Sequence, residues 1–329
     1  MSHGLRGSKT DYDALLVVSF GGPEGMDDVI PFLENVLRGR NVPRERMLQV
    51  ARHYELFGGV SPINQENREL IAALEKELDS NGPRLPIYWG NRNWHPLLPD
   101  TIRQMASEGV RNALAFVTSA YSSYSSCRQY LQNIADAQAQ VGPTAPKVEK
   151  LRAFYNHPLF IEANVDHIRA AWEQLNAPTS AQLVFTAHSI PESMAANCDY
   201  AMQLKQTGSR IAQTLNIENW ELVYQSRSGS PSQPWLGPDV CDHLNTLRTT
   251  GVEEIVVAPI GFVSDHMEVV YDLDVEARKV AEEIGMHLVR AKTAGTHPSF
   301  VRMIRELMFE RINNVVPKNI CAPDCCRIA

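Results

Sequence analysis

The sequence predicts an α/β protein of two similar lobes, each a parallel four-stranded sheet flanked by helices, with a cleft between the lobes. Short apolar runs rich in β-branched residues alternate with longer amphipathic segments, which is typical of βαβ units. The 329 residues suffice for two domains at roughly 150 residues each. The features that follow the first four runs also recur, in the same order, after the second four.

Each expected sheet takes four of eight candidate strands. The candidate strands are 14–20, 85–90, 113–120 and 148–154 in the first half, and 182–188, 221–225, 254–259 and 287–291 in the second. Amphipathic segments between them, such as 65–78 and 158–175, have apolar residues at helical spacing. The alternation of strands and helices therefore supports two parallel sheets.

The two halves carry matching turns. The first strand of each half ends in a turn with an early proline, GGP at 21–23 and SIP at 189–191. The fourth strand of each half is followed by His-Pro and an apolar helix, at 157–160 and 297–300. These matches predict a duplicated unit, although short α/β units can also resemble one another by chance. The expected lobes are 10–156 and 157–297, with a C-terminal helix and Cys-rich tail at 298–329 packing back on the first lobe.

Composition excludes several classes of protein. The net charge is −7, without a dense Lys/Arg block, which argues against a nucleic-acid-binding protein. No apolar run approaches the ~18 to 20 residues of a membrane span. The first residues lack the apolar core of a signal peptide, so a cytoplasmic location is expected. Neither a nucleotide-binding glycine fingerprint nor a nucleophile elbow is present.

His188 is the first candidate for chemistry. It ends the buried run QLVFTA, so it is expected at the carboxyl tip of a strand, the edge where α/β proteins bind ligands. Imidazole can act as a base at neutral pH because its usual pKa is near 6.5. A structural histidine is the alternative.

An acidic run follows the seventh strand. In SDHMEVVYDLDVEA, the residues Glu268, Asp272 and Glu276 lie four apart, which places them on one face if the segment is an α-helix. Carboxylates beside a histidine suit a divalent cation or a proton relay. The alternative is a solvated acidic face.

A glycine-rich loop at 58–62 is preceded by several basic residues. Arginine pairs with carboxylates in bidentate geometry, so Arg38 together with Ser61 suits an acidic substrate. Tyr124 adds aromatic surface near the expected cleft. Surface arginines and core aromatics are equally common explanations for each residue taken alone.

Five segments together resemble the ferrochelatases, which insert ferrous iron into a porphyrin. They are LLVVSFGGPE, FGGVSPIN, TAHSIPE, SGSPSQPWLGPDV and PIGFVSDHMEVVYDLDVEA, in family order through nearly the whole chain. The resemblance implies Rossmann-like lobes around a porphyrin cleft, with His188 and Glu268 as the catalytic pair and iron site. Asp272 and Glu276 match the family's row of carboxylates, as a relay or secondary metal site. Which of His188 and Glu268 binds iron first stays open.

The resemblance also suggests an iron–sulfur cluster. Six cysteines without an export signal do not indicate disulfides, and three of them crowd the last nine residues. Cys127 matches the position of an isolated ligand in cluster-bearing relatives. With Cys321, Cys325 and Cys326 it would complete the four thiolates of a [2Fe–2S] cluster. The C-x₃-C-C spacing departs from familiar forms, and a zinc site or incidental thiols are the alternatives.

The segment YSSYSSCRQY resembles enzymes of monoderm bacteria that act on coproporphyrin III. The expected substrate contacts are Arg38, Ser61, Tyr124 and Phe20, and Phe20 stands where some relatives have an iron-ligating tyrosine. Protoporphyrin IX is the rival substrate. Cobalt or nickel insertion into a sirohydrochlorin-type ring and a non-catalytic tetrapyrrole carrier are the rival functions. A downstream enzyme of heme synthesis is a candidate partner.

Overall fold

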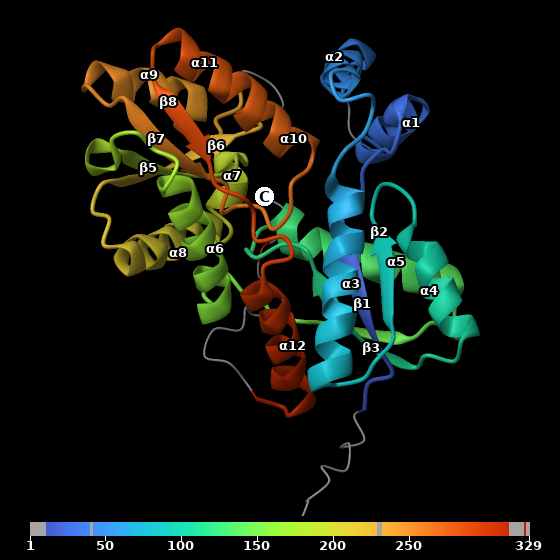
Figure 1. The fold of residues 1–329 in the computed structure, drawn as a ribbon. Helices are drawn as coiled ribbons and strands as arrows, with labels where there is room; N and C mark the ends of the chain where they lie inside the picture. Colours follow the sequence, from blue (N-terminus) through green and yellow to red (C-terminus); the bar gives the residue numbers. More distant parts are fainter. Residues whose placement is uncertain (1–10, 40–41, 229–231, 316–325, 327–329) are drawn as a thin grey trace, which may run out of the picture.

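The computed structural model describes residues 11–39, 42–228, 232–315 and 326 (Figure 1). Two four-stranded parallel sheets form the cores of the two lobes, which confirms the predicted fold class. The strands of the first sheet are β1 (Ala14–Ser19), β2 (Ile87–Asn91), β3 (Asn112–Val117) and β4 (Lys147–Lys150). Those of the second are β5 (Gln182–His188), β6 (Trp220–Gln225), β7 (Glu254–Ala258) and β8 (His287–Arg290).

Helices cover both sheets. In the first half they are α1 (Met26–Val36), α2 (Arg44–Glu55), α3 (Ile63–Asn81), α4 (Leu98–Ser107), η1 (Tyr124–Arg128) and α5 (Gln129–Val141). In the second they are α6 (Pro158–Trp172), η2 (Pro178–Ser180), α7 (Glu192–Ala195), α8 (Tyr200–Leu215), α9 (Val240–Thr249), α10 (Met267–Val269), η3 (Val270–Ala277), α11 (Arg278–Glu283) and α12 (Pro298–Ile312). Within the described ranges, no helix has both the length and the apolar character that crossing a membrane requires.

All eight expected strands form, but two of them end three or more residues before the predicted position. The run at 148–154 continues past β4, whose pairing with β3 ends at Lys150. Leu151 and Phe154 are 4% and 1% exposed because they enter the core from a loop. Apolar character therefore extended the predicted strand beyond its pairing. The expected strand at 113–120 stops at Val117 for the same reason, since Ala120 is also buried outside the ladder.

The two sheets share one topology. Their strand orders are β2-β1-β3-β4 and β6-β5-β7-β8. Leu15 pairs with Ile87 as Leu183 pairs with Trp220. Counting along the matched strands places Phe20 of the first lobe at the position that His188 has in the second. The duplicated scaffold therefore holds a histidine at only one of its two equivalent strand tips.

The helices that follow the fourth strands also start alike. His157 precedes α6 and His297 precedes α12. In each case the ring Nδ1 accepts the backbone N–H two residues later, at 3.2 Å. Each histidine thus satisfies one of the N–H groups that a helix start leaves without an acceptor. The His-Pro repeat in the sequence corresponds to a repeated helix cap.

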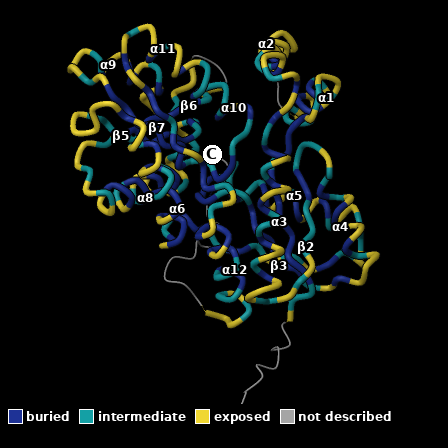
Figure 2. The backbone as a smooth tube through the Cα atoms, viewed as in Figure 1, coloured by how far each residue is buried: buried dark blue, intermediate teal, exposed yellow. Residues whose placement is uncertain are grey.

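One apolar core joins the two lobes. The ring centroids of Phe116 and Phe154 lie 5.4 Å apart, and Phe160 of α6 lies 5.4 Å from Phe154. Phe300 of α12 lies 6.1 Å from Phe160. Helix α12 packs against both α3 and α6 (Figure 1), and Figure 2 shows the buried backbone running through the strands of both lobes. The limits of the three expected domains stay a prediction.

We expect Phe160→Ala to lower the free energy of unfolding by about 3–5 kcal/mol. Phe160 is fully buried, so removal of its ring leaves a cavity in the core that the two lobes share. Urea denaturation followed by circular dichroism measures the change. The control is Met202→Ala, whose side chain is 52% exposed and whose effect should stay within about 0.5 kcal/mol. Equal effects of the two substitutions would contradict a shared core.

Candidate active site

His188 is oriented by the backbone around it. Strand β5 is buried from Leu183 to Ala187, and His188 is its last residue and half-buried. Its Nδ1 lies 2.5 Å from the Ser189 carbonyl oxygen. Because a carbonyl oxygen only accepts hydrogen bonds, Nδ1 carries a hydrogen and Nε2 is left for other partners. The Tyr200 hydroxyl donates to the His188 carbonyl oxygen at 3.0 Å and holds the strand end.

Glu268 faces the free ring nitrogen. Its Oε2 lies 3.5 Å from His188 Nε2, and the two side chains are 52% and 33% exposed. Partial burial favours the neutral carboxyl, yet His188 and, to a smaller extent, His266 lower the pKa of Glu268 to about 2. Burial lowers the pKa of His188, but Glu268, the Ser189 carbonyl and Asp272 together raise it above 6.5. Glu268 thus stabilises a proton on His188 Nε2, and solvent at these partly exposed side chains weakens the attraction between the two charges.

Asp272 extends this pair away from the strand tip. The Gln225 side-chain amide donates to Asp272 Oδ2 at 3.2 Å, and the Ser226 hydroxyl donates to the same oxygen. Burial raises the pKa of Asp272 to about 7, and the Glu268 charge adds to this, against the lowering effect of the two hydrogen bonds. Asp272 can therefore gain and lose a proton near neutral pH.

The segment that carries these carboxylates is not the α-helix expected from its spacing. After the three residues of α10, the backbone becomes a π-helix from Val270 to Ala277. Glu276 is exposed, and its charge still acts on Asp272. Residues spaced i, i+4 share a face in an α-helix and nearly so in a π-helix, so the sequence pattern could not predict the π-helix. π-Helical turns occur frequently at functional sites.

Arg290 binds side chains on both sides of Glu268, in the stretch from Asp265 to Asp274 that we call the Glu268 segment. It is the last residue of β8, and its guanidinium nitrogens donate to Asp265 at 3.0 and 2.8 Å and to Asp274 at 2.8 Å. The Thr293 hydroxyl also donates to Asp265, at 3.2 Å. Two bidentate pairs fix the loop before Glu268 and the helix after it. Arg290 was not predicted from the sequence, because its local sequence does not indicate that it binds Asp265 and Asp274.

Three contacts bring the first lobe to the same segment. The Met267 N–H donates to Ser61 Oγ at 3.2 Å, and the Asp265 N–H donates to Glu66 Oε2 at 2.7 Å. The His53 ring stacks on Tyr271 with centroids 3.8 Å apart and an interplanar angle of 7°. The Glu268 segment is therefore held from both lobes. Of these three first-lobe residues, only Ser61 was singled out from the sequence as a site residue.

The four expected substrate contacts all come from the first lobe. Arg38 is exposed beyond the end of α1 and donates to Asn35 Oδ1 at 2.5 Å. Phe20 follows β1 and packs edge-on against Phe32, with centroids 6.2 Å apart. Tyr124 is half-buried and opens η1. Ser61 is 3% exposed, so its hydroxyl serves the Met267 N–H. Their roles toward a substrate stay predictions.

The expected cluster thiols are partly described. Cys127 in η1 and Cys326 are 8% and 4% exposed, and both are free of disulfides. Cys321 and Cys325 lie outside the described residues. Among the side chains that the structure does describe, no three or more His, Cys, Asp or Glu gather in a way that could hold a metal ion.

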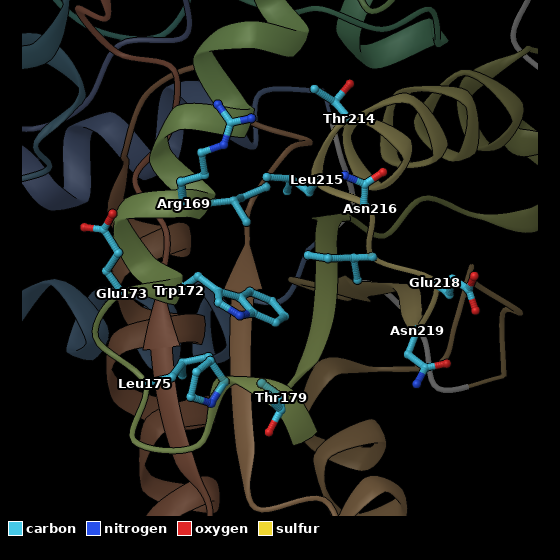
Figure 3. A pocket seen from close by; sticks show the side chains of 14 residues that line it. Arg169, Trp172, Glu173, Leu175, Thr179, Thr214, Leu215, Asn216, Glu218 and Asn219 are labelled. Atoms are coloured by element: carbon cyan, nitrogen blue, oxygen red, sulfur yellow. The ribbon is translucent and has the colours of Figure 1, made fainter.

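A cavity of about 860 Å³ lies elsewhere in the second lobe (Figure 3). It is lined by residues from the end of α6, the end of α8 and the segments just before β5 and β6, including Trp172, Leu215 and Asn219. His188 is at the opposite end of β5, about 20 Å away at the usual rise per residue. The cavity is therefore separate from the His188–Glu268 pair.

Comparison with known proteins assigns the chain to a family. Residues 12–312 match the family described as Ferrochelatase. A protein named ferrochelatase from Rhodopirellula baltica is 54% identical over 327 residues, covering 96% of this chain and 93% of its own length. Coproporphyrin III ferrochelatases from Nocardia farcinica and Streptomyces coelicolor are 49% and 47% identical, covering 95% and 96% of this chain and 96% and 93% of their own.

Solved structures agree on the fold. SirB from Bacillus subtilis with Fe³⁺ has a TM-score of 0.55 at 11% identity, covering 91% of this chain and 97% of its own. CbiX, described as the terminal enzyme of siroheme biosynthesis in denitrifying bacteria, has a TM-score of 0.53 at 13% identity, covering 92% and 100%. At such identities the likeness shows a chelatase-type fold and nothing about substrate.

Proposed function

Because this chain belongs to the ferrochelatase family, we propose that it inserts ferrous iron into coproporphyrin III during heme synthesis and releases two protons. The observation that carries the proposal is the pairing of His188 Nε2 with Glu268 at the tip of β5. The substrate follows from relatives named coproporphyrin III ferrochelatase at 47–49% identity over nearly the whole chain.

Proton removal is the first demand of this reaction. A free porphyrin carries two pyrrole N–H groups, and both protons leave when iron takes four nitrogen ligands. With Nδ1 bound to the Ser189 carbonyl, neutral His188 presents the lone pair of Nε2 as the proton acceptor. Glu268 then stabilises the imidazolium as its charge forms. The two side chains also offer donor atoms that a ferrous ion accepts as it sheds water.

The carboxylates beyond Glu268 provide a route for the protons. Asp272 has a pKa of about 7, so it can take a proton and release it at the same pH. Glu276 follows at an exposed position on the same helix. We assign the row a relay role. Binding of the propionates and the apolar ring would supply the free energy that bends the macrocycle toward iron, with Arg38, Ser61, Tyr124 and Phe20 as the proposed contacts.

An anaerobic assay with Fe²⁺ and either coproporphyrin III or protoporphyrin IX tests this function, followed by the visible spectrum of the ring. We expect faster insertion into coproporphyrin III. His188→Ala should lower kcat about 10²–10⁴-fold, because it removes the base, while porphyrin still binds and quenches protein fluorescence.

Preference for protoporphyrin IX would keep the enzyme class and correct the substrate. If His188→Ala and wild-type protein behave alike, with binding but no insertion, the protein is a tetrapyrrole carrier. Insertion of cobalt or nickel alone would move the activity to the sirohydrochlorin type.

We also propose that Cys127, Cys321, Cys325 and Cys326 hold a [2Fe–2S] cluster. Four thiolates are the donor set of such a cluster. The two described members, Cys127 and Cys326, are both buried, whereas Cys198 and Cys241 are half-buried and lie elsewhere in the second lobe. We assign the cluster a structural role. A cytoplasmic location and a downstream heme-pathway partner remain predictions from the sequence.

Protein purified anaerobically should contain two irons and two acid-labile sulfides per chain and absorb in the visible range, and Cys127→Ser should lose both properties. Cys198→Ser is the matched control, because its thiol donates to the Met194 carbonyl instead. Truncation after Lys318 should lower the melting temperature. Zinc in place of iron, or a truncated protein with unchanged spectrum and melting temperature, would contradict the cluster.

A further inference from the structure

We infer that Glu66 is a positioning residue for this reaction: from the first lobe, it holds the loop that places Glu268 opposite His188. The kinetic part of this inference rests on the proposed function. Glu66 lies in the first turns of α3, and its Oε2 accepts the backbone N–H of Asp265 at 2.7 Å. Asp265 is three residues before Glu268, so the contact acts on the main chain that carries the carboxylate.

The Glu66 contact is one of two that α3 and its approach make with this loop. Ser61 Oγ accepts the Met267 N–H at 3.2 Å, one residue before Glu268. The Met267 N–H is the first of α10, where the helix backbone offers no acceptor, and the Asp265 N–H lies in the loop two residues before that helix. Glu66 and Ser61 of the first lobe therefore supply the hydrogen-bond acceptors for two backbone N–H groups of the second lobe.

The charges around Glu66 indicate a constrained position. Burial raises its pKa to about 7, and the Asp265 carboxylate adds to this. The groups that face Glu66 are Asp265 and Arg290 from the second lobe and Glu69 from its own helix. Arg290 offsets the repulsion because it binds the Asp265 carboxylate while Glu66 binds the Asp265 N–H. Asp265 is thus held through both its side chain and its backbone.

A small shift at Asp265 reaches the reacting groups. His188 Nε2 and Glu268 Oε2 are 3.5 Å apart, and His188 is fixed by strand β5. Loss of the Glu66 acceptor removes the restraint on the Asp265 backbone, while Arg290 still binds the Asp265 side chain, so the main chain before Glu268 can shift. Displacements of about 1 Å can lower rates 10²-fold when reacting groups are misaligned. The same displacement weakens the effect of Glu268 on the His188 pKa.

The test compares Glu66→Ala, Glu66→Gln and the control Glu69→Ala, which lies one turn along the same helix at an exposed position. Glu66→Ala should lower kcat about 10–100-fold, with KM for coproporphyrin III within about twofold because Glu66 is not itself a proposed substrate contact. Glu66→Gln keeps an acceptor oxygen and should restore activity to near the wild-type rate. Glu69→Ala should match wild type.

The pH profile adds a readout that a general loss of stability does not move. Because neutral His188 is the base, activity rises as pH passes its pKa, and displacement of Glu268 lowers that pKa. The acidic limb of the kcat/KM profile should therefore shift to lower pH in Glu66→Ala and return in Glu66→Gln. NMR titration of His188 in the same variants gives the shift without any turnover.

If Glu66→Ala matches Glu69→Ala in kcat and in the His188 titration, the inference is wrong. It is also wrong if Glu66→Ala and Glu66→Gln lose activity equally with an unshifted limb. Failure of the proposed function is a distinct outcome, since wild-type protein would then insert no iron while the NMR comparison still decides the role of Glu66.

Discussion

The hydrogen bond between His188 Nδ1 and the Ser189 carbonyl decides what the rest of the site can do. It places the ring hydrogen on one nitrogen and presents the other to Glu268, at 3.5 Å. With the opposite tautomer, the group facing Glu268 would be an N–H donor without a lone pair for an incoming proton or metal. The backbone at the end of a buried strand thus selects the chemistry of a side chain.

The remainder of the structure supplies the partner of that imidazole. Glu268 comes from a segment held at Asp265 and Asp274 by Arg290 and approached from the first lobe by Ser61 and Glu66. The lobes are joined by a common core of aromatic residues and by the Tyr121 hydroxyl, which donates to the Ile260 carbonyl at 2.9 Å. A rigid junction between the lobes is therefore a condition for the geometry of the pair.

Local patterns predicted the features that depend on local sequence. All eight strands, the repeated His-Pro helix starts and the place of His188 at a strand tip follow from apolar periodicity and from the repeat. Glu66 and Arg290 could not be predicted, because their partners lie 199 and 25 residues away and ordinary surface residues have the same local sequence. The π-helix was missed because α and π winding share an i, i+4 spacing at this length.

The most direct test of the His188–Glu268 pairing is the titration of His188 by NMR in wild-type protein and in Glu268→Gln. We expect a wild-type pKa above 6.5 and a lower value in the variant, because the amide removes the charge that stabilises the imidazolium. His243, whose pKa burial lowers and on which Glu221 rather than Glu268 acts, should titrate identically in both proteins. An unchanged His188 pKa in Glu268→Gln would contradict the coupling on which the mechanism depends.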